Sequence, residues 1–89
     1  MAIALNWKEI TPGWTQAVSR EPIAIYEISE VQISKRKNGF QVQVLTETGA
    51  YDFPRSFRTL RAAQQACTNH RNHWRREIAQ ALQMTRGPQ

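Results

Sequence analysis

The residues best able to do chemistry lie near the C-terminus, where Cys67, His70 and His73 recur at three-residue steps. A thiol and two imidazoles are ligands that zinc prefers, so the spacing raises the possibility of a metal site. On a helix, however, each such step turns by about 300°, which leaves Cys67 and His73 roughly 120° apart around the axis. The chain has no second cysteine and no third histidine to complete a zinc site. We therefore expect no metal.

The same stretch offers the one local candidate for nucleophilic catalysis, a thiol near an imidazole. Cys67 falls in the middle of an apolar helical stripe, where a thiol usually serves as inert packing. The carboxylates are scattered along the chain without a pair suited to acid–base work, and no glycine-rich phosphate loop is present. We expect a protein that is not an enzyme and has no cofactor.

Basic residues are the stronger functional signal. The 89-residue chain has a net charge of +5 and a pI near 10.2. Residues 35–89 hold ten of the twelve lysines and arginines but only three of the seven acidic residues. Such asymmetry favours a polyanionic or acidic partner for this part of the chain. Charge also keeps small proteins soluble, so asymmetry alone does not decide the function.

These basic residues form two groups. The first is the run Lys35-Arg36-Lys37, and the second lies on the expected helix, with Arg58, Arg61, Arg71, Arg75, Arg76 and Arg86. Helical projection turns Arg58, Arg61, Arg76 and Arg86 away from the apolar stripe and puts Arg71 and Arg75 at its flanks. The helix carries a single acid, Glu77, so ion pairing within the helix does not explain six arginines.

A helix over residues 56–85 is predicted by apolar residues that recur at steps of three and four. They are Leu60, Ala63, Cys67, His70, Trp74, Ile78 and Ala81. This spacing makes one stripe that can cover a sheet. Ser56 and Thr59 are both suitable N-caps, and the sequence does not choose between them. Gly87-Pro88 stands where helices usually stop.

Short strands are predicted before the helix, over residues 14–54. Asn38-Gly39 favours a two-residue type I′ hairpin, which would pair Lys37 with Phe40 and Ile33 with Val44. Within 23–37 the apolar residues follow two phases, and a β-bulge near Ser29-Glu30 would reconcile them.

Turn signals occur at Thr11-Pro12-Gly13, at Ser19-Arg20-Glu21-Pro22 and at Glu47-Thr48-Gly49, and Pro54 should end strand pairing. Residues 1–13 are expected to form an irregular arm.

The expected fold is therefore a single α+β domain over residues 1–89, with a three- or four-stranded antiparallel meander covered by one long C-terminal helix. Its predicted core consists of Trp14, Ile33, Phe40, Val42, Val44, Tyr51, Phe53, Phe57, Leu60, Ala63, Cys67 and Trp74. The helix is about 39 Å long and outlasts a seven-residue strand of about 23 Å. Its end, with Ile78, Ala81 and Leu82, should overhang the sheet and is covered by the N-terminal arm or, as we favour, by a second copy.

The open sheet face suggests a nucleic-acid-binding domain, most simply for double-stranded DNA. Its expected polar residues are Gln32, Ser34, Arg36, Gln41 and Gln43. Glutamine can pair with adenine and arginine with guanine, so these side chains would read bases from a β-ribbon in the major groove. Lys35, Lys37, Arg55 and Arg58 would hold phosphates. If the helix docks instead, Arg61 and Arg76 carry the binding.

The order of strands followed by Ser56-Phe57-Arg58-Thr59-Leu60-x-x-Ala63 resembles DNA-binding domains built from a three-stranded sheet and a helix. These include the plant ethylene-response-factor domains and the arm-binding domains of phage and transposon integrases, whose helices also begin with Phe-x-Thr-x-x-x-Ala. The resemblance covers roughly residues 23–70. The layout is also similar to that of small phage and prophage proteins. It implies DNA binding by the sheet.

A second class of function remains open. A small basic domain without an active site can be a phage-type inhibitor or regulator that binds an acidic surface of a host protein complex. One cysteine allows no intramolecular disulfide, which favours a cytoplasmic setting. No apolar run reaches the length of a membrane span, so we expect no membrane partner.

Overall fold

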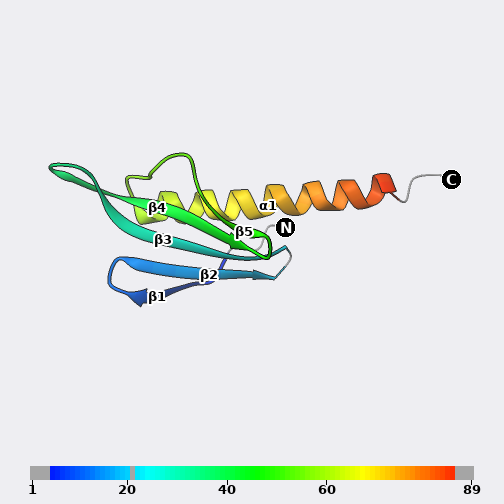
Figure 1. Ribbon diagram of the computed structural model, residues 1–89, viewed down its shortest axis with the longest axis horizontal. Coiled ribbons are helices and arrows are strands. Elements are labelled where there is room, and N and C mark those ends of the chain that lie inside the picture. Colours follow the sequence, from blue (N-terminus) through cyan, green and yellow to red (C-terminus); the bar gives the residue numbers. More distant parts are fainter. Residues whose placement is uncertain (1–4, 21, 86–89) are drawn as a thin grey trace.

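A five-stranded antiparallel sheet with one long helix across one face makes up the protein (Figure 1). The computed structural model describes residues 5–20 and 22–85, without the side chains of 84 and 85. The strands pair in chain order: β1 (Trp7–Thr11), β2 (Trp14–Arg20), β3 (Ile23–Ser34), β4 (Lys37–Thr46) and β5 (Gly49–Asp52), and the helix α1 spans Leu60–Thr85. The predicted α+β meander with a C-terminal helix is confirmed, but it has five strands, not three or four.

The extra strand comes from the segment expected to be an irregular arm. Trp7 lies opposite Ala17 in an antiparallel pair between β1 and β2, and Gly13 makes the turn between them with a φ of +83°. The prediction was wrong because β1 is an edge strand whose residues after Trp7 are all exposed. Such a strand lacks an apolar alternation and is specified by its neighbour. Residues 1–4 lie outside the described part.

The hairpin between β3 and β4 turns at Lys35-Arg36, three residues before the predicted position. Ser34 pairs with Lys37, and Tyr26, not Ile33, lies opposite Val44. Neither Asn38 nor Gly39 has a positive φ. Gly39 is buried inside β4, where an added Cβ would overlap the Ile33 side chain and lie 2.9 Å from the Phe57 carbonyl oxygen. The glycine therefore serves a close approach of backbones, not a turn.

Both alternating sets of apolar residues predicted in this segment occur in β3, on opposite faces of the strand. The helix-facing phase contains Ala24, Tyr26 and Ile28, which are buried, while Ile23 and Ile33 are 62% and 47% exposed on the other phase. No bulge occurs at Ser29-Glu30; the one irregularity in this pairing lies between Gln32 and Ser34. Pairing with β2 and β4 and contact with the helix decided which phase is buried.

The core differs in membership from the prediction and lies closer to the centre of the sheet. Of the expected residues, Val42, Val44, Phe57, Ala63 and Cys67 are buried, and Phe40, Phe53, Leu60 and Trp74 pack against them. Tyr51 is 45% exposed and Ile33 47% exposed, and Trp14 lies half-buried outside the core cluster. Leu5, Ala17, Ala24, Tyr26 and Ile28 are core residues that the sequence did not single out.

The segment between β5 and α1 continues along β4. The Phe53 amide donates to the Val42 carbonyl at 2.9 Å, and Phe57 exchanges two backbone hydrogen bonds with Phe40. Thr59 is the N-cap, since its hydroxyl oxygen accepts the Ala62 amide at 3.1 Å. The helix is thus fixed at its first turn to the middle of β4.

The far half of α1 leaves the sheet, as expected from its length. Trp74 is the last half-buried residue, and every described side chain after it is exposed. Figure 1 shows this end of the helix running past the strands. Among the described residues, no helix is long and apolar enough to cross a membrane.

Candidate nucleic-acid interface

Six basic residues gather at one end of the molecule, which we call the basic end. They are Lys35, Arg36, Lys37, Arg55, Arg58 and Arg61. Two backbone hydrogen bonds of 2.7 and 2.8 Å between Phe40 and Phe57 bring the segment before the helix against the β3–β4 ribbon. The turn of that ribbon projects beyond the first turn of α1 and beyond the β1–β2 turn (Figure 1).

The positive charge of the basic end is not neutralised internally. All six side chains are exposed, and none of them forms an ion pair with any residue that the structure describes. Glu30, the acid on β3 nearest the ribbon tip, accepts a hydrogen bond from the Asn38 amide group at 3.3 Å. The first turn of α1 has no acidic residue, so its partial positive charge adds to the same field.

The polar surface predicted for base reading is divided between two faces. Gln32 pairs with Asn38, which shares the phase of the core-facing Phe40, so Gln32 lies on the helix side of the ribbon. Gln41 and Gln43 lie on the open side. The predicted face assumed a hairpin turn at Asn38-Gly39, and the shift of that turn separates these side chains.

Of the two helix arginines assigned to docking, only one belongs to the basic end. Arg61 is in the first turn of α1, next to Arg58 and Arg55. Arg76 is fifteen residues further on, about 22 Å along the axis. Ser34 and Arg36 lie at the ribbon tip with Lys35 and Lys37.

The open sheet face carries negative charge behind the ribbon. Gln43 lies between Glu27 on β3 and Asp52 on β5. Gln16 donates to the Glu27 carboxylate at 3.0 Å, which completes a polar row across the sheet. Two carboxylates in this row repel phosphates, so the middle of the sheet is a poor docking surface for a nucleic acid.

A polar cluster that the sequence did not reveal lies between the helix and the sheet. The Tyr26 hydroxyl is 2.7 Å from His70 Nδ1, and the Tyr51 hydroxyl is 3.0 Å from His70 Nε2. Phe53 and Trp74 contact the same imidazole. A neutral histidine has one donor and one acceptor nitrogen, so one tyrosine donates to the ring and the other accepts from it. His70 thereby links the helix to β3 and β5.

The environment favours the neutral form of each of these groups. Burial, with a smaller contribution from His73, lowers the pKa of His70 below 6.5. Burial also raises the pKa of Tyr26 and of Tyr51. Strand alternation places Tyr26 on the helix-facing side if the phase of Ala24 and Ile28 is the buried one. The sequence did not show which of the two phases of β3 is buried.

The cysteine and the histidines do not form a metal site. The described residues contain no cluster of histidine, cysteine, aspartate and glutamate able to hold an ion. Cys67 is fully buried, which raises the pKa of its thiol to about 12 and keeps it protonated. His73 turns outward, with Nε2 3.1 Å from Glu77 Oε1.

Arg71, expected at the flank of the helix stripe, is 6% exposed. Its Nε donates to Asn72 Oδ1 at 2.8 Å, while its Nη2 has no hydrogen-bond partner among the described residues. A guanidinium buried in this way is not accessible to a phosphate. Arg71 therefore does not contribute to the basic end.

The molecule thus belongs to the α+β class, with a five-stranded meander, one helix and a projecting basic ribbon. Comparison of the chain with protein-family models, curated proteins and solved structures found no match.

Proposed function

We propose that this protein is a non-enzymatic nucleic-acid-binding domain that docks on double-stranded DNA through its basic end. One observation carries the proposal. Six exposed lysines and arginines, none of them ion-paired within the described chain, converge on a projecting two-stranded ribbon and the adjacent helix N-terminus. Such a concentration of uncompensated charge is the electrostatic footprint of a phosphate-binding surface.

The dimensions of the ribbon suit a duplex groove. Two strands lie about 4.8 Å apart, and the major groove of B-DNA, about 12 Å wide, admits a two-stranded ribbon. With the tip in the groove, Arg36 and the nearby amide of Gln32 are within reach of base edges. Arg55, Arg58 and Arg61 would then contact the phosphates of the strand beside the ribbon and set its register.

A duplex fits this end better than a single strand. Single-stranded nucleic acids are usually held by exposed aromatic rings on which bases stack. Phe57 is buried and Phe40 is half-buried against the core, while Arg55 covers the Phe57 ring with its guanidinium carbon 5.2 Å from the centroid. The aromatic side chains beside the six cations are therefore occupied in packing.

The proposed contact surface lies at the basic end and not in the middle of the sheet, where the sequence had placed it. Gln43 has no role in it, because Glu27 and Asp52 lie on either side. Gln41 is closer to the ribbon tip and can reach DNA only if the ribbon enters the groove deeply. A phage-type regulator that binds an acidic protein surface would use the same arginines, so the test must distinguish a nucleic acid from a protein.

The test compares two double variants that remove equal charge. Lys35→Ala/Lys37→Ala acts at the ribbon tip, and Lys8→Ala/Arg76→Ala acts on exposed residues elsewhere. Fluorescence anisotropy with a labelled duplex at several salt concentrations gives the dependence of log K on log salt. Each lost phosphate contact should lower the slope by about one, so the tip variant should lose about two and the control should lose none.

Equal slopes of log K against log salt for the tip variant and the wild type would contradict the proposal that the ribbon contacts DNA. If the wild type shows no salt-dependent binding to duplex DNA, yet captures a defined acidic protein in a manner that needs Lys35 and Lys37, the regulator function replaces this one.

A further inference from the structure

The end of the molecule opposite the basic end exposes apolar surface. Ile23 on β3 is 62% exposed, and Ile78 and Leu82 on the overhanging part of α1 are 39% and 53% exposed. A helix that projects without packing is marginal in water, since most helical stability in proteins comes from burying an apolar face. Ile78 and Leu82 lie on such a face within the last three turns of α1, and both side chains are exposed.

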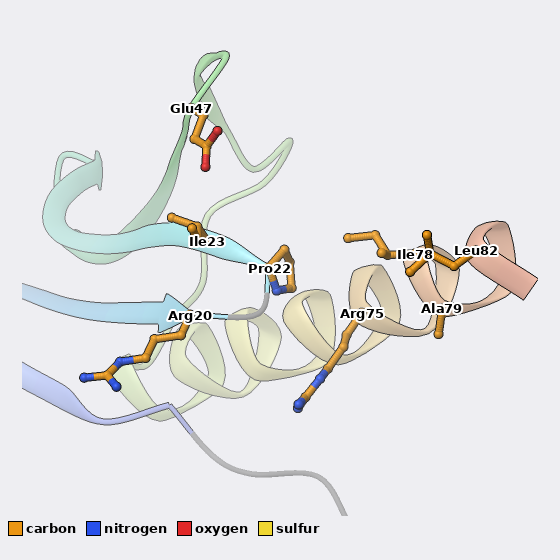
Figure 2. A pocket seen from close by; sticks show the side chains of 8 residues that line it. All are labelled: Arg20, Pro22, Ile23, Glu47, Arg75, Ile78, Ala79 and Leu82. Carbon is orange, nitrogen blue, oxygen red and sulfur yellow. The ribbon is translucent and has the colours of Figure 1, made fainter.

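A groove lies alongside this overhang, between the helix and the β2–β3 turn (Figure 2). Its volume is about 510 Å³. One wall is made by Ile78, Ala79 and Leu82 and the other by Pro22 and Ile23, with Arg20, Glu47 and Arg75 also lining it. Figure 2 shows Ile78 on the side of the helix nearest Pro22 and Ile23. Five of the eight lining residues are thus apolar, and the other three are charged.

We propose that this groove receives the overhanging helix end of a second copy of the chain, so that two molecules associate about a two-fold axis near Ile78. In this arrangement the two helices run antiparallel. Ile78 and Leu82, 40° apart in helical projection, enter the partner's groove while forming a wall of their own. Such an interface is self-complementary, as a two-fold contact must be.

Charge complementarity favours this occupant. The antiparallel arrangement brings the C-terminal end of one helix toward the β2–β3 turn of the other molecule, where Arg20 is exposed and makes no ion pair with a described residue. The last turn of α1 up to Thr85 contains no basic residue, and the partial negative charge of its carbonyl groups attracts a cation. Arg20 of the other copy would place such a cation near them.

The proposed contact is small for a protein–protein interface. Two overhangs of about eleven residues, each about 16 Å long, make an interface at or below the low end of the range for stable complexes. Ala79 is small and lets the two helices approach closely. We therefore expect a reversible dimer with a dissociation constant in the micromolar range. The basic ends would lie at opposite ends of the assembly.

Sedimentation velocity, run from low to high micromolar concentration, tests this. The wild type should shift from monomer to dimer, and Ile78→Glu should weaken dimerisation at least about tenfold because it places a carboxylate in the apolar contact. Arg20→Ala should weaken it about two- to fivefold. Ile33→Glu is the matched control, a similarly exposed isoleucine on the ribbon, and should dimerise as the wild type does.

Cysteine cross-linking gives a second readout that does not depend on stability. Cys67 is buried and its thiol stays protonated, so an introduced cysteine is the reactive one. Ile78→Cys should form a disulfide-linked dimer under mild oxidation. Gln80→Cys, which turns about 200° away from Ile78 around the helix, should not.

A wild type that stays monomeric throughout this range would overturn the proposal, as would equal cross-linking of the two cysteine variants. A monomer whose groove binds another protein, with binding lost in Ile78→Glu, would likewise overturn it and assign the groove to a different partner.

Discussion

The two ends of this molecule extend beyond a common core but have opposite chemistry. At one end the β3–β4 ribbon and the start of α1 carry Lys35, Arg36, Lys37, Arg55, Arg58 and Arg61, and all six are exposed. At the other, α1 overhangs the sheet and exposes Ile78 and Leu82 beside Ile23. Charge attracts at long range and is screened by salt, whereas apolar contact acts at short range and is not. The two ends should therefore respond differently to the same change of solvent.

Ionic strength provides the largest expected effect. If all six basic residues contact phosphates, raising salt from about 50 to about 200 mM should weaken duplex binding by about 10³-fold. Dimerisation through the apolar end should change little over that range. Anisotropy with a labelled duplex and sedimentation of the free protein, both in the same two buffers, measure the two responses. A parallel loss of both activities would mean that the two ends are not chemically distinct.

The core between the ends supplies the next largest effect. Ile28 is 1% exposed beneath the helix, so Ile28→Ala should lower the free energy of unfolding by about 2–5 kcal/mol. The same substitution at Ile33, 47% exposed on the ribbon, should change it by no more than about 0.5 kcal/mol. Urea unfolding of the two variants measures this difference. Comparable losses would show that the ribbon is packed in solution as firmly as the centre.

A smaller effect is expected from pH, through the contact that holds α1 on the sheet. The pKa of His70 is below 6.5 in the folded chain because the imidazole is buried, so the unfolded chain takes up its proton first as the pH falls. The stability due to neutral His70 is therefore complete above pH 6.5 and declines below it, until the folded form also protonates. Thermal melts at several pH values measure this decline.

Two variants make the pH test specific. His70→Gln should remove this part of the pH dependence, whereas His73→Gln should retain most of it, because His73 is exposed and pairs with Glu77. An unchanged decline in His70→Gln would show that another group is responsible.

The main elements of the fold were predictable, because each depends on a local pattern. The stripe from Leu60 to Ala81 predicted a helix over 56–85, and the observed helix spans Leu60–Thr85. Turn residues at Pro12-Gly13 and before Ile23 marked real chain reversals. β1 escaped detection because an exposed edge strand has no apolar alternation, and its pairing comes from a neighbour rather than from its own residues.

The register of the β3–β4 hairpin was not predictable. Asn38-Gly39 is a strong local turn signal, yet Gly39 lies in a strand because the Phe57 backbone passes close to it. Phe57 is eighteen residues away in the chain, and no residue near Gly39 in the sequence indicates that Phe57 lies beside it. The turn lies at Lys35-Arg36 instead. With this register Gln32 is on the opposite face of the ribbon from Gln41 and Gln43.

The sequence by itself determined the composition of the two ends: where the basic residues cluster along the chain, and that a helix longer than the strands must overhang them. Only the tertiary structure decided which phase of β3 is buried. That choice places Tyr26 beside His70, and Tyr51 contacts the same imidazole. The tertiary structure also brings the segment with Arg55 and Arg58 beside β4, through the backbone hydrogen bonds between Phe57 and Phe40. Helix length and charge are local properties of consecutive residues. Burial and strand register depend on contacts between distant segments, and two apolar phases of similar strength leave that choice to packing.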